Sequence, residues 1–207
     1  LDVLAQEFQP VVEQAADPRA KLAVMGEYIY KRWGFADRSA LPADVFVSFA
    51  DVLDKKQWNC FGLSVLYIAL GERIGLPFEL VSGRGHVFVQ LKATNYFVET
   101  TDGGKVHEGK EYLAEYLPFP CLTVDEYKPV SAREAIAVLL TQTGGAVLAQ
   151  GKAELGLSCF QHALEFDPKH AEAHAALGFF YAQGGPADLA INAFQSAIKA
   201  DPELREA

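Results

Sequence analysis

A cysteine, a histidine and a glutamate follow one another in an order that suits attack on an amide carbonyl. Cys60 stands at the expected start of a helix, within the run QWNCFGLS (57–64). The dipole and the unpaired N–H groups of a helix start favour the thiolate, which is the nucleophilic form of cysteine. The position therefore suits acyl transfer through a covalent intermediate. Taken alone, a cysteine at a helix start is more often a small residue of the core.

His86 is the candidate base for such a nucleophile. It opens an expected strand directly after the run SGRG (82–85), whose glycines allow a substrate or another chain to approach closely. Imidazole is the usual general base beside a cysteine nucleophile. Taken alone, this histidine would be a half-buried residue at a strand edge.

Strand parity selects the third residue. The strand that His86 opens alternates, and the next strand can pair with it across a four-residue connection that sets Leu91 opposite Tyr96. In this register His86 and Glu99 share a face of the sheet as diagonal neighbours, roughly 7–8 Å apart. Asp102 falls on the opposite face, and a slip by one residue would exchange the two acids. We expect Glu99 to orient the imidazole, with Asp102 as the alternative.

The elements around these residues indicate an α+β unit, with helices packed on a small antiparallel sheet. Asn59 suits the N-cap of the helix that Cys60 begins, and Gly75 suits the position just after its end. Beyond Pro77 the hydrophobic period changes from helical to alternating. The expected helices are 1–16, 19–33, 43–53, 60–74 and 106–116, and the expected strands are 78–82, 86–91 and 96–100.

A repeat begins near residue 130. The phrases FQHALEFDP (160–168) and FQSAIKADP (194–202) lie 34 residues apart, the period of the tetratricopeptide repeat. Residues 171–202 fit this helix–turn–helix pattern clearly, and 137–168 form a degenerate copy. Ser131 and Glu134 could form a capping box at the entrance. We therefore expect two domains, residues 1–130 and an all-α repeat module of residues 131–207.

The order of these motifs resembles the transglutaminase-like superfamily, whose members have a papain-like fold, and especially its bacterial branch with a core followed by tetratricopeptide repeats. The resemblance rests on NCFGLSVLYIALGERIGLPFEL (59–80), GRGHVFVQL (83–91) and YFVETTDGG (96–104). It implies a triad in which Cys60 is the nucleophile, His86 the base and Glu99 the orienting acid. Many members of the superfamily carry Asp in the third position.

Acyl transfer also requires donors for the oxyanion. The backbone N–H of Cys60 is a natural donor, and a side chain from Gln57 or Trp58 is a candidate for the second. Trp58 fits a core position equally well.

Composition narrows the classes of partner and cofactor. The net charge of -9 argues against nucleic acids and anionic membrane surfaces, and no apolar stretch reaches the about 20 residues of a membrane-spanning helix. We expect no cofactor, since the chain has no phosphate-binding glycine loop. We expect no metal site either, because His170 and His174 have ligand-like spacing but no evident third ligand. Cys60, Cys121 and Cys159 are too far apart for a metal knuckle or a disulfide framework.

The leading hypothesis is a cysteine peptidase, amidase or transglutaminase-like acyltransferase whose repeats bind a protein or peptide. Hydrolysis is favoured over cross-linking. The rival hypothesis is an inactive scaffold that keeps the same fold for protein–protein interaction. The sequence leaves the substrate, the acyl acceptor and the oligomeric state open. The compartment is also open, with the cytoplasm favoured over an exported form that has lost a signal peptide.

Overall fold

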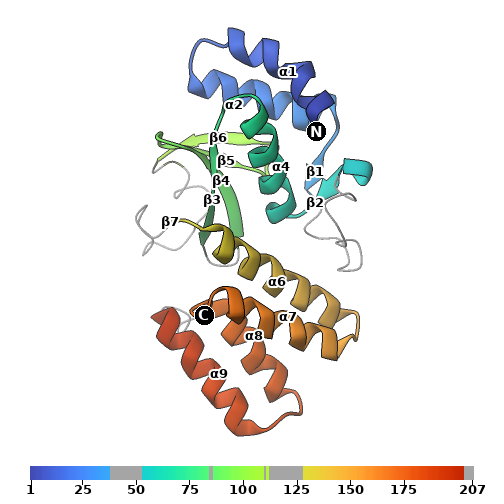
Figure 1. Cartoon of the computed structure of the whole chain (residues 1–207), viewed down its shortest axis with the longest axis vertical. Coiled ribbons are helices and arrows are strands. Elements are labelled where there is room, and N and C mark those ends of the chain that lie inside the picture. Colours follow the sequence, from blue (N-terminus) through green and yellow to red (C-terminus); the bar gives the residue numbers. More distant parts are fainter. Residues whose placement is uncertain (38–52, 84–85, 110, 112–127, 203–207) are drawn as a thin grey trace. The chain divides into compact units, whose positions relative to one another are not determined.

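The computed structural model describes residues 1–37, 53–83, 86–109, 111 and 128–202 (Figure 1). These residues form two compact units, and the chain passes from the first to the second between Val130 and Ser131. The first unit combines helices with an antiparallel sheet, and the second is helical. The predicted α+β class of the first unit is thus confirmed. In the described parts of the chain, no helix combines the length and the apolar character that crossing a bilayer requires.

Helices α1 (Asp2–Gln14) and α2 (Pro18–Gly26) open the first unit, close to the predicted ranges. Asp17 caps α2 by accepting a hydrogen bond from the Ala20 N–H at 2.8 Å. The second helix then continues as a π-helix, η1 (Glu27–Arg32), which the periodicity did not indicate. Phe8 packs edge-on against Trp33 at the end of η1, and this aromatic contact holds α1 against η1.

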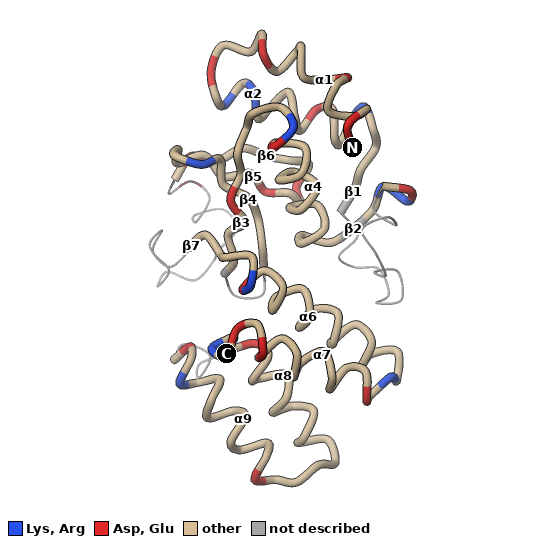
Figure 2. Tube along the Cα trace, viewed as in Figure 1, with Lys and Arg blue, Asp and Glu red and all other residues tan. Residues whose placement is uncertain are grey.

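Helix α4 (Cys60–Arg73) packs against the sheet and carries the candidate nucleophile at its first position. The Asn59 side chain accepts a hydrogen bond from the Gly62 N–H at 3.1 Å, so the predicted N-cap is confirmed. The helix carries no charged residue before its last turn, as the tan tube in Figure 2 shows, because most of its surface is buried. Gly75 follows the helix with φ of +73°, which confirms the predicted terminator.

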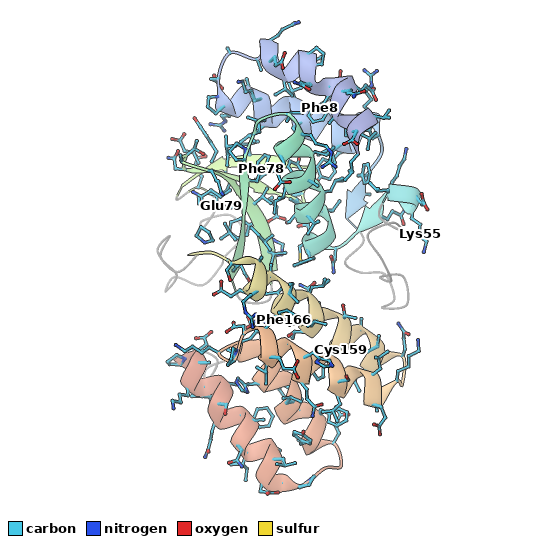
Figure 3. The ribbon with its side chains drawn as sticks, viewed as in Figure 1. Phe8, Lys55, Phe78, Glu79, Cys159 and Phe166 are labelled. Carbon is cyan, nitrogen blue, oxygen red and sulfur yellow. The ribbon has the colours of Figure 1, made fainter. Side chains whose placement is uncertain are left out.

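Among the described residues, the sheet of the first unit has five strands, all antiparallel to their neighbours, in the order β6-β5-β4-β3-β7. Phe78, labelled in Figure 3, lies between this sheet and α4, edge-on to Tyr67. The short strand β7 contains Pro129 and lies at the sheet edge, where a residue without an N–H is tolerated. The strands are β3 (Phe78–Gly83), β4 (His86–Leu91), β5 (Tyr96–Glu99), β6 (Lys105–Glu108) and β7 (Lys128–Pro129).

The β4–β5 hairpin has the predicted register, with Val89 opposite Val98 and Gln90 opposite Phe97. Continued by one residue, this register sets Glu99 opposite Phe88 and on the same face of the sheet. The four-residue connection between Leu91 and Tyr96 was sufficient to predict this pairing, because the length of a hairpin loop fixes the register of its strands.

The helix predicted for 106–116 was wrong at its start, because Lys105–Glu108 is strand β6. Gly103 and Gly104 both have positive φ, and they turn the chain back so that it pairs with β5. Tertiary pairing therefore overrides the local helical pattern. Of the rest of this predicted helix, only residues 109 and 111 are described, and most of the helix predicted for 43–53 lies outside the described residues.

A short parallel pair, β1 (Ala36–Asp37) with β2 (Gln57–Trp58), precedes α4. The Ala36 N–H also donates to the Lys56 carbonyl at 2.9 Å. This strand pair fixes the backbone at residue 58, one residue ahead of Asn59, and so helps to position Cys60.

The described residues of the second unit form two helical hairpins. The predicted capping box of Ser131 and Glu134 is present at its entrance. The second helices of the two hairpins have the same length, and their bounds are offset by 34 residues. The hairpins are α6 (Ala132–Ala149) with α7 (Ala153–Phe166), and α8 (Ala171–Ala182) with α9 (Ala187–Ala200).

The same glycine–phenylalanine contact recurs in both hairpins. A Cβ on Gly144 would lie 2.5 Å from the Phe160 ring, and a Cβ on Gly178 would lie 2.6 Å from the Phe194 ring. In each hairpin the missing side chain lets the phenylalanine of the second helix press against the backbone of the first. The two hairpins thus share this packing contact as well as the length of their second helix.

This packing predicts opposite effects for two adjacent substitutions. Gly144→Ala is expected to lower the free energy of unfolding by roughly 1–3 kcal/mol, because its Cβ would overlap the Phe160 ring. Gly145→Ala is expected to raise it by about 0.5–1 kcal/mol, since nothing lies within 4 Å of that Cβ and alanine favours the helix. Urea unfolding of the two variants measures both effects. Equal effects of the same sign would contradict the close contact.

Candidate functional site

The structure brings His86 and Glu99 together across the β4–β5 hairpin. Nε2 of His86 lies 2.8 Å from Oε2 of Glu99. The Glu99 side chain is fully buried, whereas 34% of the His86 side chain is exposed. The His86 ring also stacks on Phe88, two residues along the same strand, with the centroids 6.2 Å apart. The imidazole is therefore held on one side by an aromatic ring and at one nitrogen by a buried carboxylate.

Cys60 reaches the same histidine from the start of α4. Its side chain is buried, with 7% of the residue exposed, and it lies close enough to His86 to raise the pKa of that imidazole. Burial by itself would lower the pKa of His86. The hydrogen bonds to Cys60 and Glu99, together with the charges of these two groups, outweigh burial and raise the pKa of His86 to about 10. The imidazole accordingly holds its proton at neutral pH.

The start of α4 adds a favourable field at the sulfur. The first amide groups of a helix have no carbonyl partner in a preceding turn, and their dipoles favour negative charge there. The Asn59 side chain accepts a hydrogen bond from the N–H of Gly62. The N–H groups of Cys60 and Phe61 belong to the two positions before Gly62, at the very start of the helix. Cys60 therefore stands where backbone donors and the imidazolium of His86 both stabilise an anion.

Two threonines that sequence reasoning missed follow Glu99 directly. The N–H of Thr101 donates to Oε1 of Glu99 at 2.8 Å, and the Thr101 hydroxyl donates to the same oxygen. Threonine hydroxyls often form hydrogen bonds with groups near them in the chain, so the run ETT (99–101) carried a signal that could have been used.

Thr100 links the end of β5 to the helices of the unit. Its hydroxyl donates to the carbonyl of Cys60 at 3.4 Å and lies 3.3 Å from the hydroxyl of Ser64. Its own carbonyl accepts a hydrogen bond from the Tyr30 hydroxyl of η1 at 2.6 Å. This one residue therefore connects the segment after Glu99 with the first turn of α4 and with the π-helix.

The alternative acid and the predicted oxyanion donors are placed differently. Asp102 lies in the turn after β5, where its carbonyl accepts from the Lys105 N–H at 3.1 Å, and it is Glu99 that contacts His86. Gln57 and Trp58 form strand β2 just ahead of Asn59. The side chain of Trp58 lies outside what the structure describes, and the oxyanion role of both residues stays a prediction.

The two histidines with ligand-like spacing have local partners. Nδ1 of His170 lies 3.5 Å from a Glu172 carboxylate oxygen, and Nε2 of His174 lies 3.0 Å from the Pro168 carbonyl oxygen. Among the described residues, no three His, Cys, Asp or Glu side chains gather in a way that could hold a metal ion. Cys159 is a buried residue of α7, where burial raises the pKa of its thiol, and Cys121 lies outside the described residues.

Comparison with known proteins adds two matches. A family model described as the transglutaminase-like superfamily matches residues 1–141, which include the whole sheet and the start of α6. A UPF0162 protein of Xylella fastidiosa (strain 9a5c) is 21% identical over 198 residues, covering 89% of this chain and 70% of that protein. No solved structure gives a significant match.

Proposed function

The chain belongs to the transglutaminase-like superfamily, and from this membership we propose that it is a cysteine enzyme acting on an amide bond. Cys60 is the nucleophile, His86 the base and Glu99 the orienting acid. The observation that carries the proposal is the position of His86, whose Nε2 lies 2.8 Å from the buried Glu99 carboxylate and whose pKa the neighbouring Cys60 raises. A nucleophile, a base within its reach and an acid that orients the base are the parts that acyl transfer needs.

The proposed reaction has two steps. The Cys60 thiolate attacks the amide carbon to form a C–S bond, and the C–N bond breaks as the proton held by His86 passes to the leaving nitrogen. Water or an amine then attacks the thioester and gives a proton to His86, which releases the Cys60 sulfur. Because Glu99 holds Nε2 of the imidazole, Nδ1 is the nitrogen that carries this proton.

The negative charge on the carbonyl oxygen requires donors near the sulfur. The N–H of Cys60 supplies one from the start of α4, and a side chain of Gln57 or Trp58 supplies the other. Hydrolysis is the favoured outcome, because water is a small acceptor and 7% exposure leaves little room at Cys60 for a second protein chain.

The second unit serves as the binding module of this enzyme. We propose that its hairpins are tetratricopeptide repeats that bind a protein or peptide. The 34-residue offset between α7 and α9 supports this assignment. The recurring contacts of Gly144 with Phe160 and of Gly178 with Phe194 support it as well.

Alkylation of Cys60 tests the proposal. We expect iodoacetamide to modify Cys60 at pH 6–7 faster than a free thiol, whose pKa is about 8.5. His86→Ala is expected to slow this reaction by roughly a hundredfold. Because the pKa of His86 is about 10, the imidazolium is present at pH 6 and is lost as the pH rises toward 10. The difference between wild type and variant should therefore shrink over that range.

Peptide mapping by mass spectrometry measures the rate at each cysteine separately. Cys159 is the internal control, because burial raises the pKa of its thiol and it should react slowly. If Cys60 reacts no faster than a free thiol and His86→Ala leaves its rate unchanged, the chain is an inactive scaffold instead. A screen of amide substrates against wild type and Cys60→Ala then identifies the reaction.

A further inference from the structure

The two carboxylate oxygens of Glu99 have different partners. Oε2 lies 2.8 Å from Nε2 of His86. Oε1 accepts the N–H of Thr101 at 2.8 Å and the hydroxyl of the same residue. Thr101 thus contacts the carboxylate oxygen that does not contact the histidine.

This division matters because the Glu99 side chain is fully buried. A buried carboxylate is stable as an anion only when hydrogen bonds replace the water that it has lost. The last torsion of a glutamate is broad, so nothing in the side chain itself fixes the plane of its carboxylate. Two donors on Oε1 fix that plane and leave Oε2 directed at the imidazole.

The backbone that carries Thr101 is itself held in place. The hydroxyl of the neighbouring Thr100 donates a hydrogen bond to the Cys60 carbonyl, and the Thr100 carbonyl accepts one from the Tyr30 hydroxyl. The Gly104 N–H donates to the Glu99 carbonyl at 3.1 Å and closes the turn. The donors of Thr101 are therefore in position before any substrate binds, as an orienting contact requires.

Other titratable groups also face this part of the sheet. Lys105 of β6 is paired with Glu99, and His107 is paired with Phe97, so both stand on the same face as Glu99. Lys105 is exposed and His107 is buried. A substitution at Thr101 leaves both of these side chains in the protein. A change in the titration of His86 would therefore report the contact between Thr101 and Glu99.

We propose that Thr101 is a positioning residue. Its hydroxyl and N–H hold the Glu99 carboxylate in place, and the carboxylate in turn orients the His86 ring. This inference rests on the proposed function of Cys60, His86 and Glu99. Thr101 acts through Glu99 and does not touch the reacting atoms.

Three substitutions test this role. Thr101→Val removes the hydroxyl but keeps the side-chain shape and the N–H, and Thr101→Ser keeps the hydroxyl. Thr94→Val is the matched control, because the Thr94 hydroxyl donates to the Leu91 carbonyl in the β4–β5 turn. The readouts are the titration of the His86 ring by NMR, the pH profile of Cys60 alkylation, and the thermal unfolding midpoint.

We expect Thr101→Val to lower the pKa of His86 and to slow alkylation near pH 7 by about tenfold, the size expected for loss of a hydrogen bond to a charged group. Thr101→Ser should restore both values, and Thr94→Val should leave both as in wild type. If Thr101→Val does not fold, Thr101→Ala carries the same expectation. A folded variant without the hydroxyl whose His86 titrates as in wild type would overturn the proposal.

The titration of His86 also separates two kinds of failure. If Cys60 of the wild type reacts only as a free thiol, the proposed function fails. The NMR titration would still show whether Thr101 controls His86 through Glu99, because it requires no turnover.

Discussion

Glu99→Gln is expected to lower the pKa of His86 from about 10 toward or below its ordinary value near 6.5. The amide has the shape of the carboxylate but carries no charge. The negative charge that offset the effect of burial is then missing, and burial lowers the pKa of His86. Because His86 then loses its proton at neutral pH, the Cys60 thiolate loses its counterion. We expect acyl transfer by Cys60 to slow by on the order of ten-thousandfold, as for a triad whose acid is replaced by its amide.

Stability provides a second measurement of the same substitution. The folded-state pKa of His86 exceeds its unfolded value, so its pairing stabilises the fold fully below about pH 6.5. This contribution is lost as the pH rises through about 10. The difference in unfolding free energy between wild type and Glu99→Gln should thus be largest near pH 6.5 and should shrink toward pH 10. We expect roughly 1–2 kcal/mol, since a third of the imidazole is exposed and its charge is screened.

Glu79, labelled in Figure 3, offers the matched control for this experiment. It lies on β3 of the same sheet, with its carboxylate 3.6 Å from Nζ of Lys92. Glu79→Gln removes the same charge from a solvent-accessible pair and should leave the His86 titration and the rate at Cys60 unchanged. Equal effects of the two substitutions would mean that net charge, and not the contact with His86, controls the site.

Gly104→Ala should produce the largest loss of stability among the single alanine substitutions considered. Gly104 has φ of +74°, and a Cβ at this position would collide with the Tyr67 hydroxyl and lie 2.7 Å from Cε2 of Tyr30. Both tyrosines belong to helices that pack on the turn after β5. Because the backbone strain and the overlap add, we expect the unfolding free energy to fall by roughly 3–5 kcal/mol.

The adjacent glycine separates these two causes. Gly103 has φ of +60°, but nothing lies within 4 Å of its Cβ position. Gly103→Ala should therefore cost only the strain of the left-handed conformation, about 1–2 kcal/mol. Denaturant unfolding of both variants measures the two values. If Gly103→Ala is as destabilising as Gly104→Ala, the contact with the tyrosines contributes nothing.

The parts of the fold that the sequence predicted are those with strong local signals. The four-residue connection between two neighbouring strands gave the register of the hairpin, and the period of two along each strand then placed Glu99 on the face of His86. Asn59 and Gly75 marked the two ends of α4, because each residue type has a specific role at a helix end.

The parts that were missed depend on contacts between distant segments. Strand β6 forms because β5 offers it hydrogen bonds, and nothing within Lys105–Glu108 alone favours a strand over a helix. Strand β7 consists of two residues that pair with β3 from a distant part of the chain. The π-helical form of η1 is likewise invisible in a hydrophobic pattern, since its apolar residues also suit an α-helix.

The position of base and acid on one hairpin has a consequence for the order in which the chain assembles. His86 and Glu99 are 13 residues apart in the chain, whereas the bond between Thr100 and the Cys60 carbonyl spans 40 residues. Short loops close at a smaller cost in entropy, so contacts between near neighbours in the chain form more readily than distant ones. The acid and the base can thus meet within a local hairpin, while the thiol joins them only when α4 docks on the sheet. A partly folded chain would therefore carry no activated cysteine, and reactivity would begin only when the fold is complete.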